Sequence, residues 1–279
     1  MMSTSATALR RQDHAMSQTT DAAAYVRMAD VGMTYASARG AFTALDGIDL
    51  DLRRGEFLSL LGPSGCGKST LLKCVAGLER CTAGRIDILG RPMDGPPEGL
   101  GVVFQRDILL DWRTILDNVL LTAEFQRRDL KALRPRAQAL LARFGLDGFE
   151  NRHPWELSGG MRQRAAICRA LLVDPDLLLM DEPFGALDAM TRDDLNVELA
   201  RLWQDTRKTV LFITHSITEA VFLSDRVVML SRNPGRIVEV IDIDLPRPRP
   251  LRIRETPEFG RYTARIRHRF AELGVLKEE

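Results

Sequence analysis

The chain contains a glycine-rich turn whose residue types suit the binding of phosphate groups. Residues 62–69 read GPSGCGKS, which fits the pattern G-x4-G-K-[ST]. Glycines let successive backbone N–H groups point inward around a phosphate, where a Cβ atom would obstruct them. The turn follows the apolar run Phe57–Leu61 and precedes a helical pattern that begins near Gly67, whose N-terminal end favours anions. The pattern predicts that a nucleoside triphosphate is bound by Gly62, Pro63, Ser64, Gly65, Cys66, Gly67, Lys68, Ser69 and Thr70.

Two acidic residues follow a second apolar run, and they suit hydrolysis of a bound triphosphate. Leu177–Met180 is followed directly by Asp181 and Glu182. Hydrolysis needs one carboxylate that orients Mg²⁺ and a second group beside the attacking water. Because side chains alternate in direction at a strand end, adjacent residues can fill both roles. We therefore assign Asp181 and Ser69 to the metal and Glu182 to the general base. The alternative is a solvated acidic pair in a turn.

Cys66 lies inside the glycine-rich turn, which raises the question of a reactive thiol. The N-terminal end of the following helix and the ammonium group of Lys68 are expected to lower the thiol pKa. A small residue that simply fits the turn is an equally good interpretation. The same lysine is expected to reach the β- and γ-phosphates of the nucleotide.

Composition limits the classes of protein to which the chain can belong. It has 279 residues, 39 Lys and Arg against 38 Asp and Glu, and 45% hydrophobic residues. This balance argues against a histone-like or acidic-tail protein. No apolar run approaches the roughly 18 residues of a membrane span. The four cysteines show no CxxC spacing, which argues against a zinc ribbon. Residues 1–24 lack the apolar stretch of a secretory signal, and we interpret them as a disordered leader of a cytosolic protein.

The elements that must position these residues alternate between strands and helices. Apolar runs at 57–61, 177–180 and 209–213 predict buried strands, and alternating apolar positions at 26–28 and 48–52 predict half-buried ones. Helical patterns separate the buried runs, which predicts a largely parallel sheet covered on both faces. Residues 105–165 show only helical patterns and are expected to form an insertion in this α/β core.

The C-terminal segment is rich in proline and arginine. Between Pro246 and Phe270 the chain has eight arginines and two glutamates. A patch for nucleic acid or lipid headgroups is one interpretation. We favour a proline-stiffened linker followed by an exposed helix.

One motif points to a family. Residues 157–164 read LSGGMRQR, and with this motif the chain resembles the nucleotide-binding subunit of ATP-binding-cassette (ABC) transporters from Tyr25 to about Val240. The resemblance implies an α/β fold with a P-loop NTPase (RecA-like) core, an antiparallel β subdomain and an inserted α-helical subdomain at about 106–165. The ATPase domain would span 25–245 and a basic extension 246–279. The other family motifs occur in order at Tyr35, Gln105, Ala186-Leu187-Asp188 and His215.

The resemblance also implies a role for each motif. Tyr35 would stack on adenine, Gln105 would contact Mg²⁺ and assist catalysis, and His215 would contact the γ-phosphate and hold the attacking water. Ser158 and the N–H groups after it open a helix, which forms an anion site. In the family this site lies far from the chain's own phosphates and serves the ATP of a second copy. The residues that would contact that nucleotide are Ser158, Gly159, Gly160, Gln163 and Asp188.

The implied function is that of an ATP-hydrolysing subunit of an importer. Two copies would pack head to tail around ATP and drive uptake through a separate permease. One interpretation of Ile108, Leu109, Leu110 and Trp112 is that some of them belong to the core, and the other is an apolar groove that would receive the coupling helix of the permease. The sequences HPWELSGGMRQR and LLLMDEPFGALDAMTR resemble those of the nitrate/sulfonate/taurine branch. Asp111 stands where that branch usually has proline.

This resemblance further implies a small, often anionic solute delivered by a solute-binding protein, no nucleic-acid partner, and a peripheral location on the cytoplasmic side of the bacterial inner membrane.

Two other classes compete with this interpretation. One is a soluble ABC-type ATPase acting on nucleic acid or ribosomes, and the other is a regulatory module without catalysis. The intact residues at 68, 69, 181, 182 and 215 argue against the second.

Overall fold

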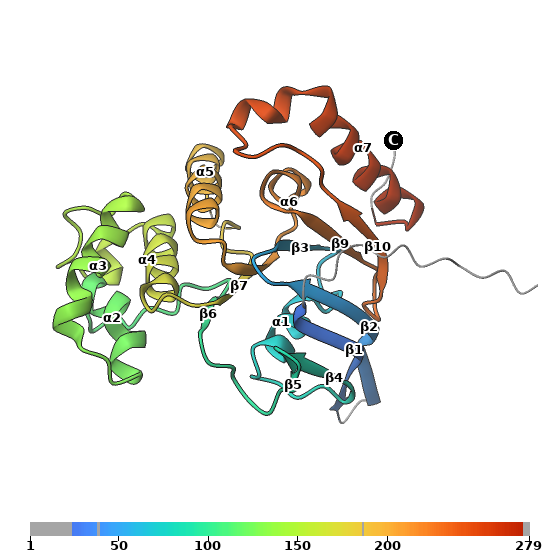
Figure 1. Ribbon diagram of the computed structural model, residues 1–279, viewed down its shortest axis with the longest axis horizontal. Helices are drawn as coiled ribbons and strands as arrows, with labels where there is room; N and C mark the ends of the chain where they lie inside the picture. The colour runs from blue at the N-terminus through green and yellow to red at the C-terminus, as the bar shows by residue number, and fades with distance from the viewer. Residues whose placement is uncertain (1–23, 38–39, 186, 276–279) are drawn as a thin grey trace, which may run out of the picture.

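A central six-stranded sheet organises the molecule (Figure 1). The computed structural model describes residues 24–37, 40–185 and 187–275, so the expected leader lies almost entirely outside the described residues. The strand order is β10-β9-β3-β8-β7-β6, parallel except for the antiparallel edge strand β10. The three predicted buried strands are β3, β7 and β8, and they lie side by side. The bounds are β3 Phe57–Leu61, β6 Leu100–Val103, β7 Leu177–Asp181, β8 Thr209–Ile213, β9 Arg226–Leu230 and β10 Ile237–Asp242.

The two faces of this sheet are covered by different layers. Side chains alternate along β3, so Leu58 and Leu60 join one apolar cluster while Phe57 and Leu61 join another. Helix α1 (Lys68–Val75) and a four-stranded antiparallel sheet cover the first face. Helices α5 (Ala189–Thr206) and α6 (Ile217–Leu223) cover the second. The antiparallel sheet has the order β2-β1-β4-β5, with β1 Ala24–Ser37, β2 Gly40–Arg53, β4 Ala83–Ile88 and β5 Arg91–Pro92.

The predicted helical insertion is present and lies to one side of the sheet, next to β6 and β7 (Figure 1). Hydroxyl or carboxylate side chains at Thr114, Asp129 and Ser158 cap its three α-helices by accepting backbone N–H groups. The insertion comprises α2 Ile115–Phe125, α3 Leu130–Arg143, the short 3-10 helix η1 Pro154–Glu156 and α4 Gly159–Leu172.

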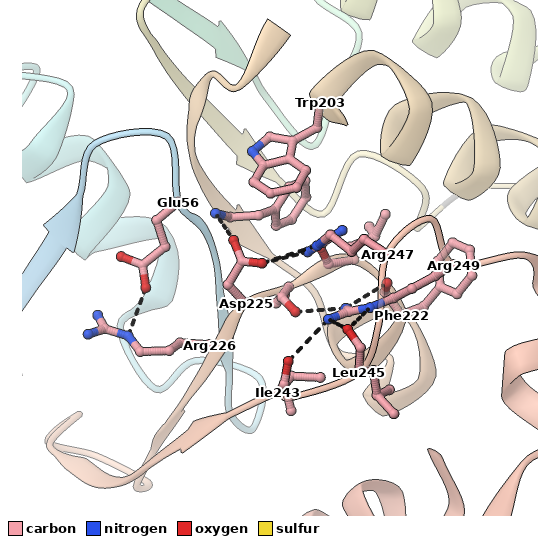
Figure 2. Close-up of polar contacts among 12 residues, drawn as sticks. Glu56, Trp203, Phe222, Asp225, Arg226, Ile243, Leu245, Arg247 and Arg249 are labelled. Carbon is pink, nitrogen blue, oxygen red and sulfur yellow. Dashed lines mark hydrogen bonds and ion pairs between the residues drawn. The ribbon is translucent and has the colours of Figure 1, made fainter. Parts of the chain in front are cut away.

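The proline- and arginine-rich segment is packed on the core, so the prediction of a linker is wrong. Arg249 is 4% exposed, and its guanidinium donates to five backbone carbonyls at 2.8 to 3.4 Å (Figure 2). Three of them belong to the C-terminal end of α6, where a helix leaves carbonyls without intrahelical partners. Burial lowers the pKa of Arg249 to about 10, so it stays protonated at neutral pH. The five acceptors are the carbonyls of Val221, Phe222, Ser224, Ile243 and Leu245.

Arg247 joins the same segment to α5. Its guanidinium lies 4.2 Å from the ring centroid of Trp203 and pairs with Asp225 at 2.9 Å (Figure 2). A guanidinium over an aromatic face adds electrostatic attraction to the apolar contact. Arg247 and Arg249 therefore hold the end of α5, the end of α6 and the C-terminal segment together.

The segment ends in η2 (Leu251–Glu255) and α7 (Pro257–Glu272), which packs along α6 and β10 (Figure 1). Phe259, Ile266 and Phe270 are buried, so the predicted exposed helix is exposed on one side only. Much of the positive charge of the segment from Pro246 to Phe270 is paired within the described chain. Six of the eight arginines make hydrogen bonds or ion pairs there, namely Arg247, Arg249, Arg254, Arg261, Arg265 and Arg269.

Candidate nucleotide-binding and catalytic site

The glycine-rich turn at residues 62–69, here called the phosphate loop, joins β3 to α1. Gly65 and Gly67 have φ angles of +77° and +97°, which side chains with a Cβ rarely adopt. A Cβ on Gly67 would also lie 2.7 Å from the carbonyl oxygen of Ala44. The loop borders a pocket of about 330 Å³ lined by Tyr35, Phe42, Ala44, Ser64, Gly65, Gly67, Lys68, Ser69, Thr70, Gln105 and Glu182.

Lys68 is buried and folds back over the phosphate loop. Its Nζ donates to the carbonyl oxygens of Gly62 at 2.8 Å and Pro63 at 2.9 Å. These neutral acceptors hold the ammonium group at the loop. A phosphate is a stronger acceptor for an ammonium group, so the lysine can exchange these bonds for a bond to a nucleotide.

Ser69 and Asp181 form the pair expected to hold Mg²⁺. The hydroxyl of Ser69 donates to Oδ1 of Asp181 at 3.1 Å. Burial and the neighbouring Glu182 raise the pKa of Asp181, and a bound cation would reverse that shift by favouring the carboxylate. Hydroxyl and carboxylate oxygens fit Mg²⁺, which takes its remaining ligands from phosphates and water. Within the described residues no group of three or more His, Cys, Asp or Glu forms a separate metal site.

The three residues expected to act in hydrolysis come together at the end of β7. Oε2 of Glu182 accepts a hydrogen bond of 3.0 Å from the Gln105 amide and lies 3.6 Å from Nδ1 of His215. Glu182 has a φ of +45°, a left-handed conformation that is uncommon outside glycine and clusters at functional sites. Its backbone N–H is fixed by the carbonyl of Ile213 at 2.9 Å. The left-handed turn directs the carboxylate toward the phosphate-loop pocket, which Glu182 and Gln105 both line.

Tyr35 lies at the rim of the pocket, and a second aromatic residue pairs with it. Tyr35 of β1 is opposite Phe42 of β2 in the register of the antiparallel sheet. The Tyr35 hydroxyl bonds to Glu79 and lies 3.4 Å from the Thr70 hydroxyl. Stacking of Tyr35 on adenine stays a prediction. Sequence reasoning missed Phe42, because the pairing of β1 with β2 that places it opposite Tyr35 becomes evident only in the folded chain.

The expected lowering of the Cys66 thiol pKa is wrong. Cys66 is 1% exposed, and burial raises its pKa more strongly than the nearby Lys68 lowers it. Its Sγ lies 2.7 Å from the position that a Cβ on Gly62 would take. Of the two interpretations, the structure supports the small residue that packs inside the phosphate loop.

Comparisons with known proteins agree with this geometry. The family model for the ABC transporter matches residues 45–185, half of the chain. An uncharacterized ABC transporter ATP-binding protein of Methanocaldococcus jannaschii is 48% identical over 236 residues, 85% of each chain. The chain belongs to the ABC transporter ATP-binding proteins.

Other ABC relatives point to the same branch that the motifs resemble. The taurine import ATP-binding protein TauB of Rhizobium johnstonii is 48% identical, covering 73% of this chain and 78% of its own. TauB of Escherichia coli K12 is 47% identical, covering 75% and 82%. Among solved structures, the ABC cassette MJ0796, a dimer bound to ADP and Pi after hydrolysis, superposes with a TM-score of 0.72 at 32% identity, covering 79% of this chain and all of that one. None of the helices in the described part of the chain is both long and apolar enough to cross a bilayer.

The LSGGMRQR motif at residues 157–164, here called the ABC signature, lies at the start of α4, apart from the phosphate loop. The Ser158 hydroxyl caps α4 by accepting the N–H of Met161 at 3.3 Å, and Gly159 and Gly160 form the first turn. None of these residues lines the phosphate-loop pocket. Gln163 differs from the nucleotide contact that the resemblance implies, because it is buried and donates to the carbonyl of Phe104 at 3.1 Å. It therefore supports the chain next to Gln105.

The segment after β7 leads into α5 and packs against the ABC signature. Ala186 lies outside the described residues. Asp188 caps α5 by accepting the N–H of Thr191 at 3.0 Å, and this bond lowers the pKa of the exposed carboxylate. Leu187 is buried, and its Cδ2 lies 2.8 Å from the position that a Cβ on Gly160 would take. Glycine at position 160 thus allows the signature helix to approach the segment that carries Asp188.

Proposed function

We propose that this chain is the ATP-hydrolysing subunit of an ABC importer. The observation that carries the proposal is the convergence of Gln105, Glu182 and His215 beside the phosphate loop. Glu182 accepts the proton of the attacking water, and His215 holds the water and contacts the γ-phosphate. Lys68 neutralises charge on the β- and γ-phosphates, while Ser69, Asp181 and Gln105 would hold Mg²⁺. When bound, Mg²⁺ offsets the charge that develops on the phosphates.

A complete ATP site needs a second copy of the chain. Ser158, Gly159 and Gly160 offer backbone N–H groups at a helix N-terminus, yet they do not line their own phosphate-loop pocket. In a head-to-tail dimer they meet the γ-phosphate bound by the partner. The dimeric arrangement of the cassette MJ0796 supports this assembly. ATP then stabilises the dimer, and hydrolysis to ADP and phosphate releases it.

An exposed apolar patch after Gln105 supports a permease partner. Trp112 is 74% exposed, Phe125 78% and Ile108 53%. The Arg113–Glu124 ion pair brings the segment that carries Trp112 close to the C-terminal end of α2, which carries Phe125. Large exposed apolar side chains that gather in one area mark interaction sites. We assign this patch to a cytoplasmic helix of the permease.

The relatives indicate the solute class and the location. TauB proteins, named for taurine import, are 47–48% identical to this chain. We infer uptake of a small anionic solute of the sulfonate, taurine or nitrate type, delivered by a solute-binding protein. The subunit would bind peripherally to the cytoplasmic side of the bacterial inner membrane. A soluble ATPase acting on nucleic acid or ribosomes has less support, because most arginines of the C-terminal segment are paired internally.

The proposal is tested by isolating the complex that contains the permease. Tagged Glu182→Gln is incubated with ATP in detergent-solubilised membranes and recovered, and its partners are identified by mass spectrometry. Recovery of a multi-span permease is expected. Recovery of soluble or nucleic-acid partners alone, with ATP-dependent dimers still forming, would contradict the importer assignment.

A surface variant assigns the docking patch in the same experiment. Trp112→Ser, made in the Glu182→Gln chain, is expected to lose the permease while ATP-dependent dimers still form. Leu78→Ser is the matched control, because Leu78 is 53% exposed but lies after α1, outside the patch. Equal recovery of the permease by both variants would remove Trp112 from the docking surface.

A further inference from the structure

The turn that carries His215 is held by a buried carboxylate with no direct access to the ATP pocket. The Thr214 hydroxyl accepts the N–H of Ser216 at 3.0 Å and donates to Oε2 of Glu219 at 2.5 Å. His215 lies between the two residues of the first bond, so its backbone position depends on Thr214. Glu219 is 5% exposed, and it does not line the phosphate-loop pocket.

The other oxygen of Glu219 faces a cation of a different helix. Oε1 lies 3.5 Å from Nε of Arg192, which is in the first turn of α5. Nη2 of Arg192 donates to the carbonyl of Leu187 at 2.9 Å. One carboxylate thus joins the turn of His215 to the segment that carries Asp188. A buried carboxylate whose cation is removed stays in the interior uncompensated, which makes the arrangement sensitive to each member.

The connection continues to the ABC signature. Leu187 packs against Gly160, where a Cβ would approach its Cδ2 to 2.8 Å. The path Thr214–Glu219–Arg192–Leu187, here called the relay, therefore begins beside His215 and ends at Gly160. Under the proposed dimer, His215 acts on the chain's own ATP, while the signature acts on the partner's. The relay thus links the two ends of one chain that serve different nucleotides.

The C-terminal segment lies against the relay. Arg254 of η2 pairs with Asp193, the neighbour of Arg192, and its guanidinium carbon lies 4.8 Å from the ring centroid of Phe222 in α6. The positive charge of Arg254 lowers the pKa of Glu219, while burial raises that pKa more strongly. Nε and Nη2 of Arg254 are buried without a hydrogen-bond acceptor among the described residues. Arg254 therefore adds a second positive charge beside the relay.

We propose that Glu219 is a positioning residue for ATP hydrolysis, which acts through Thr214 on His215 and through Arg192 on the Asp188 segment. It touches no substrate atom. Its role is to fix the position of the His215 turn relative to the contact between Leu187 and the ABC signature. The histidine that holds the water and the signature that serves the partner's ATP are then both correctly placed in the dimer. The proposal rests on the ATPase function proposed above.

The test measures steady-state ATP hydrolysis by the full-length chain and by Glu219→Gln. Glutamine keeps the shape and can still accept the Thr214 hydrogen bond, but it loses the charge opposite Arg192. We expect kcat to fall at least about tenfold while KM for ATP stays within about twofold, the pattern of a loss confined to the transition state. Arg192→Gln is expected to give the same split, and the double variant is expected to be no slower than either single variant.

Arg192→Gln also keeps the proposal testable if Glu219→Gln does not fold, because its side chain is 31% exposed. Glu239→Gln is the matched control. Glu239 lies on β10, away from the relay, and the substitution removes its ion pairs with Arg265 and Arg269 of α7. Unchanged kcat in the relay variants, strictly additive losses, or a fall in kcat matched by a rise in KM would overturn the proposal. A wild-type chain that hydrolyses no more ATP than Glu182→Gln would overturn the ATPase function as well.

Discussion

The Gln105 amide donates a hydrogen bond of 3.0 Å to the carboxylate of Glu182. Gln105 follows β6 at the start of the helical insertion, and Glu182 follows β7 in the central sheet. These two strands are neighbours in the sheet, so their carboxyl ends lie at the same edge. The bond therefore joins the segment that leads to the proposed permease patch with the residue assigned to hydrolysis. A movement of the insertion can change the surroundings of the catalytic carboxylate through this contact.

Glu182→Gln is expected to bind ATP, form ATP-dependent dimers and turn over at least about 100-fold more slowly. The substitution removes the proton acceptor and keeps the shape of the side chain, and general-base catalysis contributes about 10²–10⁴-fold. Phosphate release measures turnover, and size-exclusion chromatography with and without ATP measures dimers. The exposed Glu98→Gln serves as the control. Normal hydrolysis by Glu182→Gln would remove Glu182 from its role.

The central part of the fold could be predicted because its signals are local. Continuous apolar runs marked β3, β7 and β8, which are buried on both faces. The strands β4, β5 and β10 gave no clear pattern, since most of their residues are half-buried or exposed. The C-terminal segment was misjudged for another reason. Arginine in a sequence usually indicates a solvent-exposed position. The backbone carbonyls that surround Arg249 come together only in the folded chain.

In the candidate site, too, residues with local sequence signals could be predicted, and residues that depend on contacts between separate elements could not. The phosphate loop, Asp181 and Glu182 could be predicted, because a strand, a turn and a helix lie consecutively in the sequence. Glu219 and Phe42 could not, since their partners come from other elements. The error at Cys66 came from weighing charge without burial. A nearby ammonium group lowers a thiol pKa, but desolvation of the thiolate is the larger effect at a fully buried position.

Tyr35 provides a test of the adenine contact. Tyr35→Phe keeps the ring and loses the bonds to Glu79 and Thr70, and it is expected to bind ATP within about threefold of wild type. Tyr35→Ala loses the stacking surface, and we expect affinity to fall by about tenfold, equivalent to roughly 1.4 kcal/mol. Fluorescence titration with a labelled ATP analogue measures both. Equal affinity of Tyr35→Ala and wild type would assign the adenine to another surface.

Cys66 is expected to react slowly with maleimide at neutral pH. Its raised pKa reduces the thiolate fraction, and burial blocks access, so labelling should be at least about tenfold slower than at the partly exposed Cys81. Mass spectrometry of timed digests measures both rates in one sample. Cys66→Ala is expected to retain ATPase activity, since a small side chain still fits the loop. Rapid labelling of Cys66 that ATP prevents would show a reactive thiol and contradict this expectation.

Arg249 is expected to contribute more to stability than any exposed arginine of its segment. Arg249→Met leaves the carbonyls at the end of α6 buried without donors, and each unsatisfied group costs about 1–3 kcal/mol. We expect the free energy of unfolding to fall by about 3 kcal/mol or more, measured as a lower midpoint in urea. Arg249→Lys is expected to be intermediate, because an ammonium keeps the charge and loses the planar fork. The exposed Arg252→Met is the control. A midpoint for Arg249→Met equal to that of Arg252→Met would show that the buried guanidinium does not hold the segment on the core.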